Sequence, residues 1–186
     1  MKKLITNNIQ GWKVLLFFIL ANVVYAYMLL ISIPKVMSYS NGMKILDMMP
    51  GGYDAIFVNT LFNTLGETGR RVYLYLQIPA DMIYPLLFGI SYTLLLAYFL
   101  KKLNKHNTGL FYLCLLPIVA GIADYLENIG IIIMLKHYPG LSDNQIMFTN
   151  LFTLIKSTFT TIYFIILILV LIILGINLIK IRIREK

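Results

Sequence analysis

Apolar and polar positions alternate along the chain in long blocks, and four apolar blocks are long enough to cross a membrane as helices. The helices that they predict cover about residues 14–33, 72–100, 109–135 and 143–180, the last beginning before its apolar block of about 158–179. A transmembrane helix needs about 20 mostly apolar residues. The pattern therefore predicts an all-α integral membrane protein, a four-transmembrane-helix bundle that forms a single transmembrane domain over residues 1–186.

The connection between the first two blocks, residues 34–71, is long and carries a pattern of its own. After Asp54, apolar residues recur at helical spacing: Ile56, Phe57, Leu61, Phe62 and Leu65. Such spacing indicates an amphipathic helix, and Asp54 can cap its first turn. We therefore expect a partly helical loop that lies on the membrane surface or folds back over the bundle.

Basic side chains set the expected orientation. They gather before the first block, between the second and third, and at the C-terminus: Lys2, Lys3, Lys13, Lys101, Lys102, Lys105, Lys180, Arg182, Arg184 and Lys186. The other two connections mix basic with acidic residues. Cytoplasmic loops are enriched in Lys and Arg, so we expect both termini to be cytoplasmic and the 34–71 loop to face outward.

The composition agrees with a membrane location. Apolar residues make up 59% of the chain and charged residues only 13%, whereas a soluble domain carries about a quarter charged residues. The net charge of +8 fits cytoplasmic helix ends that contact anionic lipids, and no basic stripe with interleaved aromatics indicates nucleic acid. We expect a multi-pass protein of a bacterial plasma membrane, with lipids as partners and homo-oligomers allowed.

The residues that most often bind metals are sparse and scattered. Cys114 is the single cysteine, and His106 and His137 fall at separate predicted helix ends. None of the three has a second ligand at the spacing of a zinc site. We therefore expect no metal site and no cofactor.

Ionisable side chains inside the predicted helices are the candidate functional residues, because their burial in a membrane is costly. Helical spacing groups most of the second-helix candidates on one face and the third-helix candidates on another. The full set is Arg70, Arg71, Gln77, Asp81 and Tyr84 from the second helix, Asp124, Glu127 and Asn128 from the third, and Lys156 from the fourth.

Two backbone features accompany these candidates. Pro85 lacks an N–H group, so it leaves the carbonyl of Asp81, four residues earlier, without its helical partner. Gly121 lies one turn from Asp124 and allows another helix to approach closely. We also expect Pro117 to bend the third helix nearer the cytoplasm.

Counting about 1.5 Å per residue from the cytoplasmic ends puts the three acids about 24–30 Å up, in the outer third of the membrane. Lys156 comes just above them, and Arg70 and Arg71 higher still. The sequence therefore predicts a polar cavity inside the bundle that opens outward, with acids at its floor and basic residues at its rim.

This cavity has three functional interpretations. It binds a lipid-like or small amphiphilic molecule from the outer leaflet, or it is an intramembrane enzyme in which Asp81 and Glu127 act as acid and base. In the third interpretation the acids relay protons in proton- or cation-coupled transport. The simplest alternative is a structural membrane subunit, with polar residues that only fix the helix register and with Lys156, Arg70 and Arg71 as interfacial anchors.

Aspartates in a four-helix membrane protein resemble the arrangement of lipoprotein signal peptidases, although the Asn- and Gly-containing blocks around the aspartates of those enzymes are absent here. The architecture also resembles the sterol-isomerase and sigma-2-type membrane fold, without a shared motif and with a longer first loop. Neither resemblance assigns the chain to a family.

Overall fold

The computed structural model describes residues 5–6 and 8–184, the side chains of 181–184 excepted. This part of the chain is 85% helical and contains no strand. Four helical stretches are long and apolar enough to cross a membrane: Gly11–Met37, Ala55–Lys102, Gly109–His137 and Asp143–Lys180. The prediction of an all-α protein with four helices of transmembrane length is confirmed.

Three of the four stretches contain a change of helix type. The first joins α2 (Gly11–Tyr27), the π-turn η1 (Met28–Ser32) and α3 (Ile33–Met37). The second joins α4 (Ala55–Val72), the π-turn η3 (Tyr73–Gln77) and α5 (Ile78–Lys102). The third begins as the 3₁₀ helix η4 (Gly109–Leu115) and continues as α6 (Leu116–His137), with Pro117 in the first turn of α6. The fourth is α7 (Asp143–Arg184).

The connection between the first two stretches is less irregular than residues 34–71 suggested. Residues 34–37 belong to α3 and residues 55–71 to α4, so only 38–54 lie outside these helices, and they include the short 3₁₀ helix η2 (Leu46–Met48). Asp54 caps α4 by accepting a hydrogen bond from the N–H of Phe57 at 2.7 Å. The second helical stretch thus begins earlier than residue 72.

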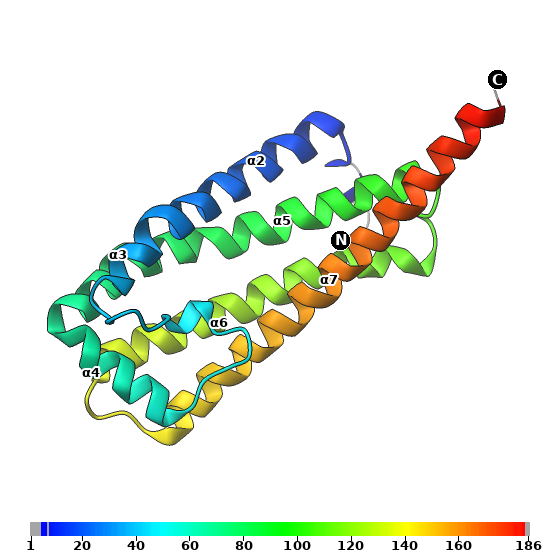
Figure 1. The fold of residues 1–186 in the computed structure, drawn as a ribbon. Coiled ribbons are helices and arrows are strands. Elements are labelled where there is room, and N and C mark those ends of the chain that lie inside the picture. Colours follow the sequence, from blue (N-terminus) through cyan, green and yellow to red (C-terminus); the bar gives the residue numbers. More distant parts are fainter. Residues whose placement is uncertain (1–4, 7, 185–186) are drawn as a thin grey trace.

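A kink at Gly66 lets α4 fold back over the bundle. Its backbone has φ 60° and ψ −175°, outside the helical region and in a range that glycine adopts easily. The apolar face before this kink, which includes Leu61, Phe62 and Leu65, is buried against the rest of the protein. Figure 1 shows α4 crossing one end of the bundle, which we call the α4 end. The start of α2 and the last turns of α7 lie at the opposite end, which we call the terminal end.

The long helices pack in the order α2, α5, α6 and α7. Helix α2 packs on α5, α5 on α6 and α6 on α7, so that α2 and α7 flank the bundle (Figure 1). Two apolar clusters fill its two ends. The cluster at the α4 end includes Leu61, Phe62, Tyr73 and Ile131, and the cluster at the terminal end includes Phe88, Tyr92, Leu96, Phe111 and Tyr163.

Helices α5 and α6 approach each other closely at Gly121. A Cβ atom added at Gly121 of α6 would lie 2.8 Å from the carbonyl oxygen of Pro85 in α5. Glycine therefore lets the two backbones approach as the sequence predicted. Gly130 makes a similar approach to the side chain of Thr149, where α6 meets α7.

Replacing Gly121 with alanine should force α5 and α6 apart. We expect Gly121→Ala to cost about 1–3 kcal/mol, as overpacking of a tight contact does, and to lower the midpoint of thermal unfolding in detergent. Gly175→Ala is the matched control, because no atom of the described residues outside its own helical turn lies within 4 Å of its added Cβ. Equal midpoints for the two variants would contradict the close α5–α6 contact.

Candidate functional site

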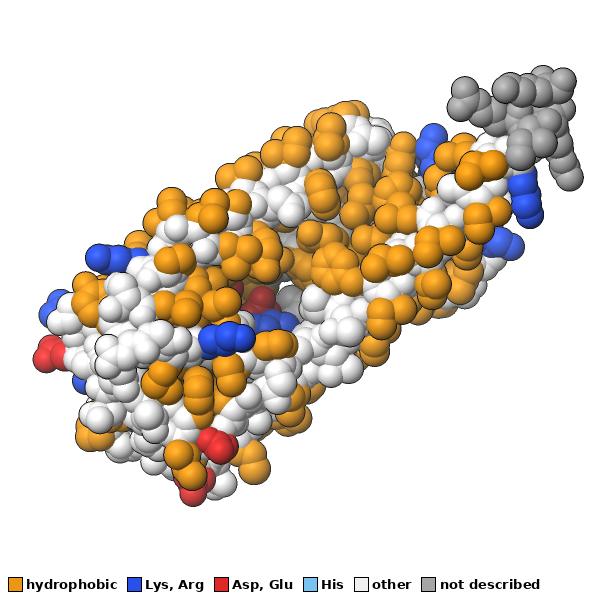
Figure 2. Space-filling model, viewed as in Figure 1, with side chains coloured by type: hydrophobic (Ala, Val, Ile, Leu, Met, Phe, Trp, Pro, Cys, Tyr) orange, Lys and Arg blue, Asp and Glu red, His pale blue; other side chains and the backbone are white. Residues whose placement is uncertain are grey.

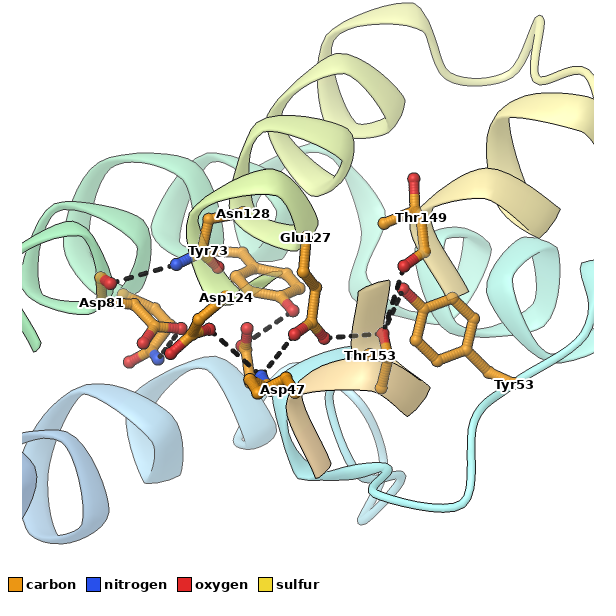
Figure 3. Close-up of polar contacts among 11 residues, drawn as sticks. Asp47, Tyr53, Tyr73, Asp81, Asp124, Glu127, Asn128, Thr149 and Thr153 are labelled. Atoms are coloured by element: carbon orange, nitrogen blue, oxygen red, sulfur yellow. Dashed lines mark hydrogen bonds and ion pairs between the residues drawn. The ribbon is translucent and has the colours of Figure 1, made fainter. Parts of the chain in front are cut away.

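Polar side chains from four helical stretches and one loop meet between the two apolar clusters (Figure 3). We call this set the polar layer. Its members are Ser32, Asp47, Tyr53, Tyr73, Gln77, Asp81, Asp124, Glu127, Asn128, Thr149, Thr153 and Lys156. Groups of this kind are costly to bury unless each finds a partner, so their contacts define the site.

Lys156 joins α7 to α6 through two carboxyl groups. Its Nζ lies 3.2 Å from Oδ1 of Asp124 and also pairs with Oε2 of Glu127. Asp124 and Glu127 are three residues apart and so share a helical face, which lets one ammonium group contact both. Glu127 is fully buried, and its Oε1 accepts a hydrogen bond from Thr153 at 2.8 Å. This pairing offsets much of the cost of burying the charges.

Asn128 serves the carbonyl that Pro85 leaves free. Its Nδ2 donates to the backbone oxygen of Asp81 at 3.0 Å, and both residues are buried. In a regular helix the N–H at position 85 would make this bond, but proline has none. The predicted free carbonyl is thus confirmed, and its partner comes from α6.

The side chain of Asp81 is held through a chain of amide and hydroxyl groups. Nε2 of Gln77 lies 3.5 Å from Oδ2 of Asp81, and Oε1 of Gln77 accepts a hydrogen bond from Ser32 at 2.5 Å. Ser32 and Gln77 close the two π-turns, η1 and η3. Single π-turns often occur at functional sites. Here both face the polar layer.

The loop of residues 38–54 closes the polar layer at the α4 end. Asp47 accepts a hydrogen bond from the hydroxyl of Tyr73 at 2.8 Å, and the hydroxyls of Tyr53 and Thr153 are 3.2 Å apart. Burial, followed by the nearby charge of Glu127, raises the pKa of Tyr53, so its hydroxyl keeps its proton. These two contacts attach the loop to both η3 and α7.

A backbone contact also holds this loop against α7. The N–H of Tyr53 donates to Oδ1 of Asn150 at 2.9 Å. Gly52 has φ 86°, and a Cβ there would lie 2.5 Å from the same oxygen. Only glycine combines this backbone conformation with so close an approach.

A cavity of about 340 Å³ adjoins the polar layer. Its polar wall includes Asp47, Asp81, Asp124 and Lys156, and its apolar wall includes Met28, Leu29, Ile33 and Phe88. Tyr25 from α2 and Ser157, Thr160 and Thr161 from α7 line it as well. Figure 2 shows acidic and basic side chains at the bottom of a hollow that hydrophobic side chains surround. The hollow lies between α2 and α7, along the side of the bundle (Figures 1 and 2).

The structure brings most of the predicted site residues together. Asp81, Tyr84, Asp124 and Lys156 line the cavity. Gln77, Glu127 and Asn128 are buried and bond to residues of the polar layer.

Arg70 and Arg71 lie elsewhere, so neither contributes to a basic rim. Arg70 donates to the carbonyl of Phe62 at 2.7 Å and lies over the ring of Tyr138, 4.5 Å from its centroid. Arg71 is exposed.

Sequence reasoning missed the residues that the loop contributes. Asp47 and Tyr53 belong to a segment without strong periodicity. Ser32 stands among apolar residues of the first helix, so no sequence pattern singled it out. The one available signal was the acidic charge of Asp47 beside the helix breaker Pro50-Gly51-Gly52.

No family model, no curated protein and no solved structure matches the chain.

Removing the ammonium group of Lys156 should leave two buried carboxyls without their cation. We expect Lys156→Met to destabilise the protein by about 3 kcal/mol, measured as a lower midpoint of thermal unfolding in detergent. Adding Glu127→Gln should restore part of the loss, because it removes one of the unpaired charges. Lys136→Met, at an exposed lysine of α6, is the control. A similar midpoint for both lysine variants would show that the ion pairs contribute nothing.

The bond from Asn128 to the carbonyl of Asp81 can be isolated with a double-mutant cycle. Asn128→Leu should cost about 1–3 kcal/mol, since it leaves a buried carbonyl without a donor. Pro85→Ala supplies a backbone N–H to the same carbonyl, so Asn128→Leu should cost less in that background. Unfolding midpoints of the four proteins test this coupling, and strictly additive effects would exclude it.

Proposed function

We propose that the protein binds an amphiphilic, lipid-like molecule that enters the cavity sideways from the bilayer. The observation that carries this proposal is the position of the opening. The cavity opens between α2 and α7, at a level between the apolar clusters that fill the two ends of the bundle. In a membrane such an opening faces lipid rather than water, so its natural ligands are molecules dissolved in the bilayer.

The two walls of the cavity match the two parts of an amphiphile. Asp81, Asp124 and Lys156 offer charged and hydrogen-bonding groups to a polar head. Met28, Leu29 and Ile33 offer an apolar surface to a tail. The volume of about 340 Å³ lies within the usual range of small-molecule sites, about 300–1,000 Å³. A head group and the first part of a chain fit such a space.

Apolar packing in the terminal half of the bundle supports ligand binding rather than conduction of protons or cations. Beyond the cavity, the hydroxyl of Tyr163 donates to the carbonyl of Tyr92 at 2.7 Å, and the rings of Phe88, Tyr92 and Tyr163 contact one another. Leu96, Ala97 and Leu100 continue this apolar filling. A proton or cation leaving the polar layer in this direction would meet apolar packing rather than a chain of polar groups.

The orientation that accompanies this proposal is the one the basic residues favour. Lys13, Lys101, Lys102, Lys105 and Lys180 belong to the terminal end, so we assign that end and both termini to the cytoplasm. The α4 end and the loop of residues 38–54 then face outward. In this arrangement a multi-pass protein of a bacterial plasma membrane receives its ligand from the outer leaflet.

Filling the cavity tests the proposal. Ser157 lines it, whereas the neighbouring Thr158 is exposed and does not. We expect the wild-type protein and Thr158→Phe to retain a stoichiometric amphiphile through detergent purification, detected by mass spectrometry of an organic extract. Ser157→Phe should lose it, since the added ring occupies the space. Equal retention by the two folded variants, or no stoichiometric amphiphile in the wild type, would refute the proposal.

A further inference from the structure

We infer that the head of the bound amphiphile is a cation, an ammonium group held between Asp47 and Asp81. This inference rests on the proposed function and names the class of its ligand. It follows from the balance of charge around the cavity, from acceptor atoms that lack donors, and from the aromatic side chains in the wall.

Carboxyl groups outnumber basic groups in the polar layer. Among the described residues it contains four carboxyl groups, those of Asp47, Asp81, Asp124 and Glu127, and one ammonium group, that of Lys156. Lys156 is already paired with Asp124 and Glu127. Asp47 and Asp81 therefore remain without a basic partner in the part of the chain that the structure describes.

Basic side chains of the neighbouring segments are directed elsewhere, and Lys44 of the same loop is exposed. Arg70 bonds to the carbonyl of Phe62 and covers the ring of Tyr138. Lys35 lies over the ring of Tyr39, 5.6 Å from its centroid. No described cation other than Lys156 lines the cavity. The missing positive charge has to come from a proton or from a ligand.

Acceptor atoms mark the place for that charge. Asp81 is 3% exposed and lines the cavity, yet its carboxyl receives only the long bond from Gln77 among the described amide, ammonium and hydroxyl groups. Oδ1 of Asp47 is buried and receives no hydrogen bond from a described donor, and the two carboxyls lie within hydrogen-bonding reach of each other. Two adjacent carboxylates repel, whereas an ammonium group carries three donors and a positive charge for both.

The adjacent wall of the cavity is aromatic. The rings of Tyr25 and Tyr84 stack with centroids 5.2 Å apart, and the ring of Phe88 lies 5.7 Å from that of Tyr84. All three line the cavity. Ring faces attract cations, most strongly where water is excluded. The same carboxyls would repel a head that carries only negative charge.

Two sources supply this chemistry, a free alkyl amine and a lipid whose head ends in an amine. Their shared feature is an ammonium group on an apolar chain. They differ in the phosphate that the lipid head carries next to its amine. Lysophosphatidylethanolamine therefore distinguishes the sources: binding at least as tight as that of a simple amine indicates a lipid head, and weaker binding indicates a free amine.

The preference for a cationic head group can be measured with amphiphiles that share a 12-carbon chain and differ only in the head. Dodecylamine, dodecanol and dodecanoate present a cation, a neutral hydroxyl and an anion, and lysophosphatidylethanolamine of the same chain length completes the series. Each is titrated into the full-length protein in an uncharged detergent, and the shift of the unfolding midpoint gives an apparent Kd. We expect dodecylamine to bind at least about tenfold more tightly than dodecanol, with dodecanoate weakest.

Substitutions connect that preference to the two carboxyls. Asp81→Asn and Asp47→Asn should each reduce the advantage of dodecylamine over dodecanol. Asp47 belongs to the loop, so its variant provides the test if Asp81→Asn fails to fold. Asp143→Asn removes an exposed carboxyl near the α4 end and should leave the preference unchanged.

The outcomes separate this inference from the proposed function. Dodecanol or dodecanoate binding as tightly as dodecylamine would overturn the cationic head and would point to a proton shared by Asp47 and Asp81, with amphiphile binding intact. A preference for dodecylamine that persists in both aspartate variants would overturn the site between them. If no member of the series binds saturably, the proposed function itself fails.

Discussion

The pairing of Lys156 with Asp124 and Glu127 is the interaction on which the rest of the polar layer depends. A charged carboxylate between two apolar clusters is costly without a cation in contact, and α7 supplies one to Asp124 and Glu127. The pair fixes α6 against α7 at one level. Glu127 and Thr153 then continue the contact toward the loop of residues 38–54.

The backbone extends this polar layer as much as the side chains do. Pro85 frees a carbonyl of α5, and Asn128 of α6 bonds to it. The π-turns η1 and η3 end in Ser32 and Gln77, which join the first two helical stretches through one hydrogen bond. These departures from the regular helix are thus matched by partners on other helices, as a nearly water-free interior requires.

Packing order explains why the polar layer is accessible. Helices α2 and α7 flank the bundle, and the cavity lies between them. The loop of residues 38–54 and the cluster around Tyr92 and Tyr163 bound it in the two directions along the helices. Because the cavity opens toward the side of the bundle, a ligand reaches its charged wall past apolar side chains. That combination suits a ligand with a polar head and an apolar chain.

The sequence alone determined the elements that depend on local pattern. Hydrophobic length predicted four helices, helical spacing grouped Asp124, Glu127 and Asn128, and the covalent structure of proline predicted the free carbonyl of Asp81. The amphipathic stretch after Asp54 was also visible, although its continuation into the second long helix was not, because Gly66 acts as a kink rather than a stop.

Only the tertiary structure decided which distant residues complete the site. Tyr53 meets Thr153 across 100 residues of sequence, and Asp47 meets Tyr73 across 26. The tertiary structure also places Arg70 against Phe62 and Tyr138, away from the carboxyl groups of the polar layer. Such contacts depend on how a loop and a kinked helix fold back over the bundle. Helical periodicity records only which face of its own helix a residue occupies, so it carries no information about them.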